Sequence, residues 1–114
     1  MKPLRQKSAS RPEDKIVEEL TAFLKARDWL VKKTHGNIFQ FGFPDLYCAH
    51  FKYGQRWIEV KVPERIKFTG AQLEFFPQLI AHGVGVWVLV AATENEYLKL
   101  FRPSNYYQIT LERL

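Results

Sequence analysis

The spacing of apolar residues along the chain predicts two helices. In residues 13–29 the apolar side chains recur every three or four positions, as Ile16, Val17, Leu20, Phe23 and Leu24. Pro12 lies where a helix can start, and the acids that follow it favour a first turn. A second helix is predicted from Thr69, a residue type that caps helix N-termini, to Gly83, and Pro77 should kink or interrupt it.

Short runs of β-forming residues predict a sheet between and after these helices. The runs are residues 30–34, 45–51, 56–62 and 84–92. The last of them is nearly all apolar, which predicts a strand that is covered on both faces. Residues 97–101 and 106–111 fit either further short strands or a terminal helix. This order of elements predicts an α/β fold in which helices flank a mixed sheet.

The stretch IEVKV, residues 58–62, alternates apolar and charged side chains, so Glu59 and Lys61 share one face of a strand. A strand with one solvent-exposed face and an incidental ion pair has this pattern, and so does a strand that contributes catalytic residues. The residues KYG, 52–54, predict a hairpin turn that places Asp45 opposite Lys61. Asp45 then joins Glu59 and Lys61 on one face, although a turn one residue longer would send it to the other face.

Two carboxylates on one face repel each other, so one of them should have a raised pKa unless a divalent metal ion binds both. Oxygen ligands from Asp45 and Glu59 suit Mg²⁺, which also binds phosphate oxygens. Lys61 beside them would hold the attacking water or stabilise charge on a phosphate. A helical projection places Glu13 in the middle of the apolar stripe of the first helix, where it either points towards the metal or is a solvated first-turn acid.

The net charge of +5 is unevenly distributed along the chain. Residues 1–12 contain four basic residues and no acid, and we expect a basic disordered tail there, followed by a single domain over residues 13–114. Basic residues also outnumber acids in residues 32–67. A basic tail together with a basic segment suits a polyanion such as DNA. The alternative is that the tail is only a solvated start of the chain. The candidate nucleic-acid contacts are Lys33, His35, Lys52, Arg65 and Lys67.

Composition narrows the class of protein. A hydrophobic content of 46% predicts a packed domain and not a disordered chain, and no apolar run is long enough to span a membrane. No signal-peptide pattern opens the sequence. The single cysteine, Cys48, fits a reducing compartment, so we expect a cytoplasmic protein. Because Cys48 lies in an apolar run, we expect it to be a core residue and not a nucleophile.

The same residues resemble a known family. Pro44-Asp45, then 13 intervening residues, then Glu59-Val60-Lys61 resemble the PD-(D/E)XK nuclease signature. The stretch EDKIVEEL is similar to the first helix of archaeal Holliday junction resolvases. The longer pattern THGN…GFPDLYC…IEVKV…TGAQLEFFPQLIAHG resembles small stand-alone nucleases of the virus-type replication-repair class (VRR-Nuc). The resemblance covers roughly residues 13–90.

This resemblance implies a restriction-endonuclease-like core and a metal-dependent DNA endonuclease. Its cofactor would be Mg²⁺, for which Mn²⁺ substitutes, and its substrate would be branched DNA, either a Holliday junction or a flap, as in DNA repair. A homodimer is expected, because a branched duplex is pseudo-symmetric. No membrane partner is expected. A nucleic-acid-binding module that kept the fold without cutting is the alternative, and a structural ion pair in an unrelated domain is a third hypothesis.

The family match also implies a role for each site residue. Asp45, Glu59 and the Val60 carbonyl would bind the metal, and Glu13 would bind or orient through water. Lys61 would be the catalytic lysine. Gln72 would lie near the scissile phosphate, although Thr69-x-x-Gln72 is also the spacing of a capping box, which gives Gln72 a purely structural role.

Two groups of aromatic residues complete the predictions. The tryptophans Trp29, Trp57 and Trp87 are expected in the core and not as platforms for bases. The candidates for a wedge that faces DNA lie in the glycine-containing loop and are Phe39, Phe41 and Phe43.

Overall fold

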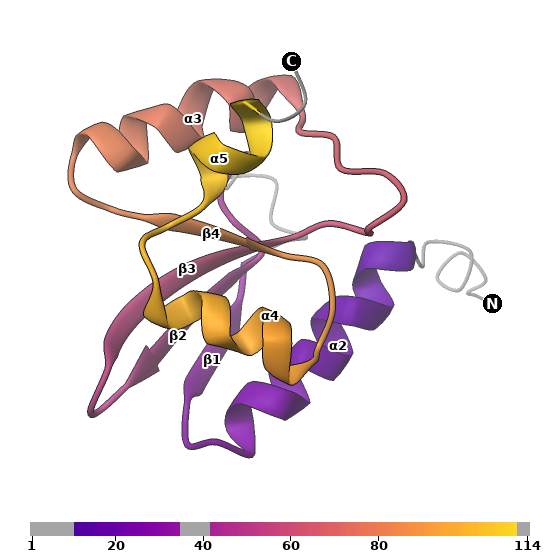
Figure 1. Cartoon of the computed structure of the whole chain (residues 1–114), viewed down its shortest axis with the longest axis vertical. Coiled ribbons are helices and arrows are strands. Elements are labelled where there is room, and N and C mark those ends of the chain that lie inside the picture. The colour runs from indigo at the N-terminus through magenta and orange to yellow at the C-terminus, as the bar shows by residue number, and fades with distance from the viewer. Residues whose placement is uncertain (1–10, 35–41, 112–114) are drawn as a thin grey trace, which may run out of the picture.

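The computed structural model describes residues 11–34 and 42–111 (Figure 1). Its elements are α2 (Pro12–Lys25), β1 (Leu30–Lys33), β2 (Leu46–His50), β3 (Gly54–Val60), α3 (Gly70–Ala81), β4 (Val86–Leu89), α4 (Glu94–Leu98), η1 (Lys99–Phe101) and α5 (Tyr106–Leu111). The predicted tail lies outside the described residues except for Arg11 and Pro12, which begin α2. His35, Phe39 and Phe41 also lie outside them.

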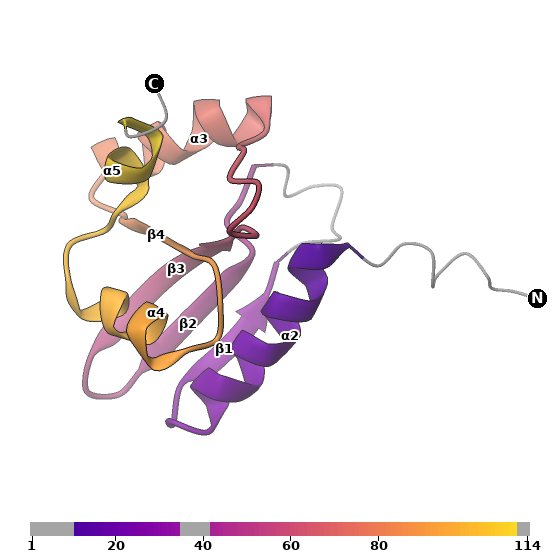
Figure 2. The same cartoon turned by 45° about the vertical axis from the view of Figure 1, so that its right-hand side comes forward.

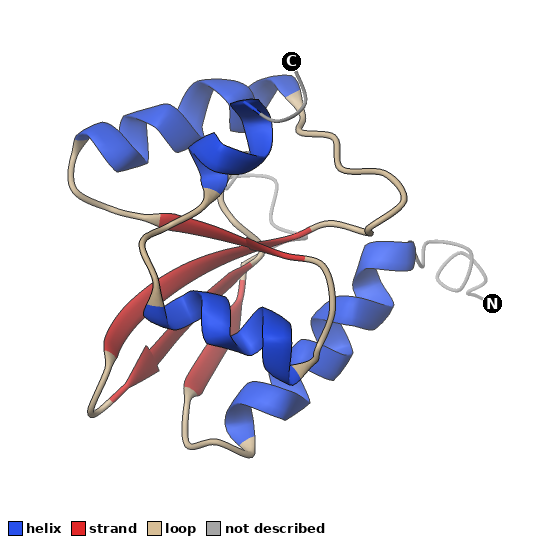
Figure 3. Cartoon of the chain, viewed as in Figure 1, coloured by secondary structure: helices blue, strands red, loops and turns tan. Residues whose placement is uncertain are grey.

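The four strands form one sheet in the order β1-β2-β3-β4. The pairs β1–β2 and β2–β3 are antiparallel, and β3–β4 is parallel, so the sheet is mixed as predicted. Figure 3 shows the strands in red with helices packed around them. The predicted α/β architecture is therefore confirmed.

The register of the β2–β3 hairpin differs from the prediction. Leu46 pairs with Ile58 and His50 pairs with Gly54, and the same register continued by one residue sets Asp45 opposite Glu59 and not opposite Lys61. The reason is that residues 51–53 form the turn, while Gly54, with φ 92°, already belongs to β3. The pairing shifts by two residues, and an even shift keeps every side chain on its predicted face.

The helices differ from the prediction at two points, and the structure decides a third that the sequence left open. The first helix ends at Lys25 and not at residue 29, and Asp28 beyond it takes a positive φ of 71°. Pro77 does not interrupt α3, which runs on to Ala81. A proline removes one helical hydrogen bond, and the adjacent, fully buried Phe76 holds this part of the helix in the core. Residues 97–101 and 106–111 are helical and not strands.

Two apolar clusters cover the two faces of the sheet. Val17, Leu20 and Leu24 of α2 pack with Ile58 and other residues of one face, together with Tyr97 and Leu100. On the other face, Phe76 of α3 and Tyr106 of α5 pack with Val86 and Val88. Figure 2 shows β4 between α3 and α5 on one side and α4 on the other. The fourth strand is thus covered on both faces, as its apolar sequence predicted.

Single residues test two further predictions. Cys48 is fully buried, and burial raises the pKa of its thiol to about 12, so it is a core residue without nucleophilic character at neutral pH. Trp29 and Trp87 pack in the core, but Trp57 stays outside both clusters and is partly exposed. Within residues 11–34 and 42–111, no helix combines the length and apolar character needed to cross a membrane.

Candidate active site

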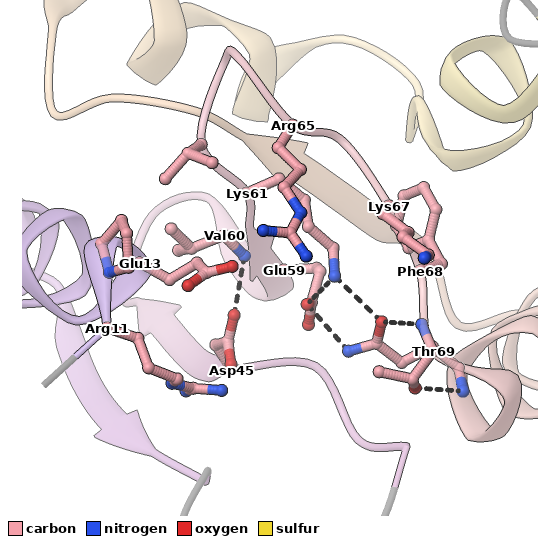
Figure 4. A pocket seen from close by; sticks show the side chains of 13 residues that line it. Arg11, Glu13, Asp45, Glu59, Val60, Lys61, Arg65, Lys67, Phe68 and Thr69 are labelled. Carbon is pink, nitrogen blue, oxygen red and sulfur yellow. Dashed lines mark hydrogen bonds and ion pairs between the residues drawn. The ribbon is translucent and has the colours of Figure 1, made fainter. Parts of the chain in front are cut away.

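A cavity of about 460 Å³ lies at the carboxyl end of β3, between the N-termini of α2 and α3 (Figure 4). It is lined by Arg11, Pro12, Glu13, Asp45, Glu59, Val60, Lys61, Val62, Arg65, Lys67, Phe68, Thr69 and Gln72. Helix N-termini carry partial positive charge and free N–H groups, so two of them facing one cavity favour an anionic ligand.

Asp45 is held at the cavity by the loop that precedes β2. Gly42 has φ +82°, and a Cβ there would lie 2.9 Å from the Ala71 carbonyl oxygen, so only glycine fits against α3. Thr34 donates its backbone N–H to the Asp45 carbonyl at 2.9 Å and its hydroxyl to the Pro44 carbonyl. The Asp45 Oδ2 accepts the Val60 N–H at 2.9 Å, which fixes the carboxylate beside β3.

Glu59, Lys61 and Gln72 form a buried network on the other side of the cavity. Lys61 Nζ lies 3.1 Å from Glu59 Oε2 and 3.0 Å from Gln72 Oε1. Gln72 Nε2 donates to the same Glu59 oxygen at 2.8 Å. Both Glu59 and Lys61 are at most 5% exposed. Glu59 Oε1 is buried but accepts no hydrogen bond from the described residues, which leaves one carboxylate oxygen available for a ligand.

The pKa of Glu59 is raised to about 8. Burial is the largest cause, and the negative charge of Asp45 adds to it, while Lys61 and Gln72 act in the opposite direction. The sequence predicted that one of two facing carboxyls would have a raised pKa, and Glu59 is that group. Burial and Asp45 thus favour the protonated form of Glu59, and a bound cation would favour the charged form.

Gln72 combines the two roles between which the sequence could not decide. Its backbone N–H donates to Thr69 Oγ1, and its Oε1 accepts the Thr69 N–H, both at 3.1 Å, so the capping box is present. The same side chain contacts Glu59 and Lys61. The cap of α3 therefore fixes the amide that holds the lysine.

Glu13, Arg11 and Phe68 complete the cavity. Glu13 is half-buried at the start of α2, and its side chain points into the cavity (Figure 4). Arg11 was counted with the tail by sequence alone, but Asp14 Oδ2 accepts its N–H at 2.9 Å and fixes it at the helix start. Lys61 Nζ lies 4.8 Å from the centroid of the Phe68 ring, a cation–π contact that no sequence pattern indicated.

The predicted nucleic-acid contacts separate into two groups. Arg65 and Lys67 line the cavity. Lys33 does not line it and binds Glu18 at 3.0 Å. Lys52 lies in the hairpin turn at the other end of β2 and β3, with its Nζ over the Tyr53 ring. His35 lies outside the described residues.

The donor set fits a hard divalent cation. Among residues 11–34 and 42–111, no three carboxylate, imidazole or thiol groups form a preformed metal cluster. The cavity instead offers two carboxylates, Asp45 and Glu59, one of them with an unsatisfied oxygen, and the adjacent backbone of Val60. Few protein ligands with room for retained water are typical of Mg²⁺ and not of structural zinc.

No protein-family model and no curated protein matches this chain. A solved structure described as a VRR_NUC domain matches with a TM-score of 0.63 and 20% sequence identity. The match covers 82% of this chain and 98% of that chain. At this identity the likeness is one of fold, and the chain has a VRR-Nuc-like nuclease fold, as the sequence motifs predicted.

Proposed function

We propose that this chain is a Mg²⁺-dependent endonuclease that hydrolyses phosphodiester bonds in branched DNA and works as a homodimer. One observation carries the proposal. A carboxylate with an unsatisfied buried oxygen, Glu59, lies with a buried lysine and opposite Asp45 in a cavity bounded by two helix N-termini. Clustered acids repel phosphates, so this arrangement serves a DNA-binding protein only if a cation joins it.

Asp45, Glu59 and the Val60 carbonyl are the proposed metal ligands, and Glu13 would contribute through water. A bound Mg²⁺ would polarise the phosphodiester and lower the pKa of the attacking water. Before metal binds, the Lys61 ammonium is shared between Glu59 and Gln72. In the reaction, Lys61 would donate to a phosphate oxygen as negative charge develops there.

Basic side chains at the edge of the cavity would bind the phosphates on either side of the cut. Arg65 and Lys67 are exposed and line the cavity opposite Arg11. Arginine binds phosphate in a bidentate manner and lysine as a point charge. A small domain covers few nucleotides, so two copies related by a twofold axis would suit the pseudo-symmetry of a branched duplex.

The test is cleavage of a four-way junction, a flap and a plain duplex, each with Mg²⁺ and with EDTA. We expect metal-dependent cutting of a branched substrate, lost in Lys61→Ala and retained in Lys25→Ala, which removes an exposed lysine at the far end of α2. Binding without cutting in every condition would favour the non-cleaving module. Equal activity in wild type and Lys61→Ala would contradict the proposed mechanism.

A further inference from the structure

A row of aromatic rings runs across the sheet face beside the cavity. Phe75 of α3 stacks on Phe43, with ring centroids 4.9 Å apart and an interplanar angle of 23°. Phe43 lies 5.9 Å from Trp57, and Trp57 lies 5.1 Å from Tyr47. All four rings are partly exposed to solvent. We call Phe43, Tyr47, Trp57 and Phe75 the aromatic row.

The aromatic row lies on the face that carries the candidate site. Tyr47 pairs directly with Trp57 across the hairpin, and Trp57 precedes Glu59 by two residues, so all three side chains share this face. The apolar cluster on this face joins α3 and α5 to Val86 and Val88 of β4 and does not extend to β1 or β2. Part of the sheet face next to the cavity is therefore left to aromatic side chains.

The position of the row matches the path of a DNA strand bound in the cavity. Phe43 and Tyr47 lie two residues on either side of Asp45. Trp57 and Glu59 are two residues apart in β3, a span of about 7 Å in an extended strand, so the row begins one step from the proposed scissile phosphate. Nucleotides adjoining that phosphate would lie over the rings.

Charge on this face also favours nucleic acid. Lys32 is exposed and pairs directly with Tyr47, so it lies on the same face. The carboxylates that β2, β3 and the residue before β2 place on this face are Asp45 and Glu59, and both line the cavity. A phosphate backbone bound along this face would bring negative charge to Lys32.

We propose that the aromatic row is a stacking platform for unpaired bases of the DNA strand next to the cleavage site. Stacking on aromatic rings accepts every base and requires that the base be unpaired. This inference rests on the proposed nuclease function and narrows its substrate class. It assigns a flap or another branch with a single-stranded arm, in preference to a fully paired junction.

The test is DNA binding in EDTA, where no cleavage occurs, with a short fluorescent single strand and a duplex of the same sequence. Trp57→Leu should weaken single-strand binding on the order of tenfold and leave duplex binding unchanged. Phe43→Leu is a second variant on a separate element, in case one substitution impairs folding. Phe51→Leu is the matched control, because Phe51 is 90% exposed in the hairpin turn, away from the row.

Each outcome is decisive. Unchanged single-strand binding in both folded variants overturns the platform, and so does an equal loss for both kinds of DNA. Sedimentation of the same variants tests whether the aromatic row is instead a subunit interface. A dimer that dissociates on Trp57→Leu would also overturn the platform. Binding is measured without metal, so it does not depend on cleavage. A selective loss of single-strand binding supports the platform even if the wild-type protein fails to cut DNA. Failure to cut would count against the nuclease proposal alone.

Discussion

At the carboxyl end of β3 the two faces of the strand are buried to the same depth but by different chemistry. On one face Ile58 and Val60 are 0% and 1% exposed and pack in the cluster that contains α2. On the other face Glu59 and Lys61, at the carboxyl end of the strand, are 2% and 5% exposed. Aliphatic side chains gain free energy when they leave water, whereas ionisable ones lose it unless their polar atoms find partners.

The difference shows which face is built for stability and which is built for chemistry. The network around Glu59 satisfies one carboxylate oxygen, and the other accepts no hydrogen bond from residues 11–34 and 42–111. An unsatisfied buried oxygen destabilises the fold and is retained where function needs it. In the described part of the chain the aliphatic face carries no such group, and its packing holds the strand that positions the site.

The largest expected effect is on the aliphatic face. Ile58→Ala should lower the free energy of unfolding by about 2–5 kcal/mol, because it leaves a cavity in the cluster beneath α2. Urea unfolding measures the change. Leu73→Ala is the matched control, since Leu73 is 53% exposed on α3 and its loss should change stability by less than about 0.5 kcal/mol. Similar losses for both variants would contradict the packing described for this face.

On the polar face the expected loss is in activity and not in stability. Glu59→Gln should reduce metal-dependent cleavage at least about 100-fold, because the amide is a poor Mg²⁺ ligand. The free energy of unfolding at pH 8 should stay unchanged or increase, because a buried ionisable group has been replaced by a neutral one of equal size. Cleavage assays and urea unfolding on the same preparation check both parts. A variant that unfolds easily yet retains activity would reverse the assignment of the two faces.

The assignment of residues to the two faces of β3 was predictable from sequence, because side chains in a strand alternate between faces with a period of two residues. The hairpin turn was assigned one residue too late, yet Asp45, Glu59 and Lys61 still share a face, since the resulting shift in pairing is even. The spacing of Thr69 and Gln72 likewise contained both the cap and the contact to Lys61.

Other parts of the site follow from tertiary packing and leave no periodic signal. Arg11 lines the cavity because α2 begins there, and Phe68 contacts Lys61 because the segment between β3 and α3 forms part of the cavity wall. Pro77 shows the opposite error, where a local rule predicted an interruption that packing overrides. Trp57 was predicted to lie in the core, whereas its face of the sheet is only partly covered.

The raised pKa of Glu59 predicts a pH dependence of stability for the metal-free protein. The folded state binds a proton at Glu59 up to about pH 8, whereas the unfolded chain releases it near 4.5. Stability from this group is therefore present below the unfolded pKa and is lost as pH rises towards 8, by at most about 1.4 kcal/mol per pH unit. Urea unfolding between pH 5 and pH 8 in EDTA measures the slope.

Glu59→Gln is the control for this slope, since it removes the titrating group and should flatten the profile in the same pH window. Added Mg²⁺ should oppose the loss in wild type, because the ion binds the deprotonated carboxylate. A wild-type profile as flat as that of the variant would show that Glu59 does not hold a proton in the folded protein.

The smallest expected effect comes from removing a helix cap. It distinguishes a cap that only stabilises the fold from one that also positions a residue of the candidate active site. Thr69 and Thr93 both cap a helix by accepting a backbone N–H, from Gln72 in α3 and from Glu96 in α4. Replacing either by alanine should cost about 1 kcal/mol of stability. Only Thr69→Ala should also reduce cleavage, because Gln72 loses the anchor that aligns its amide with Glu59 and Lys61. If the two variants cleave equally at equal thermal stability, the Thr69 cap is not needed to position Gln72. The cap of α3 would then serve only the fold.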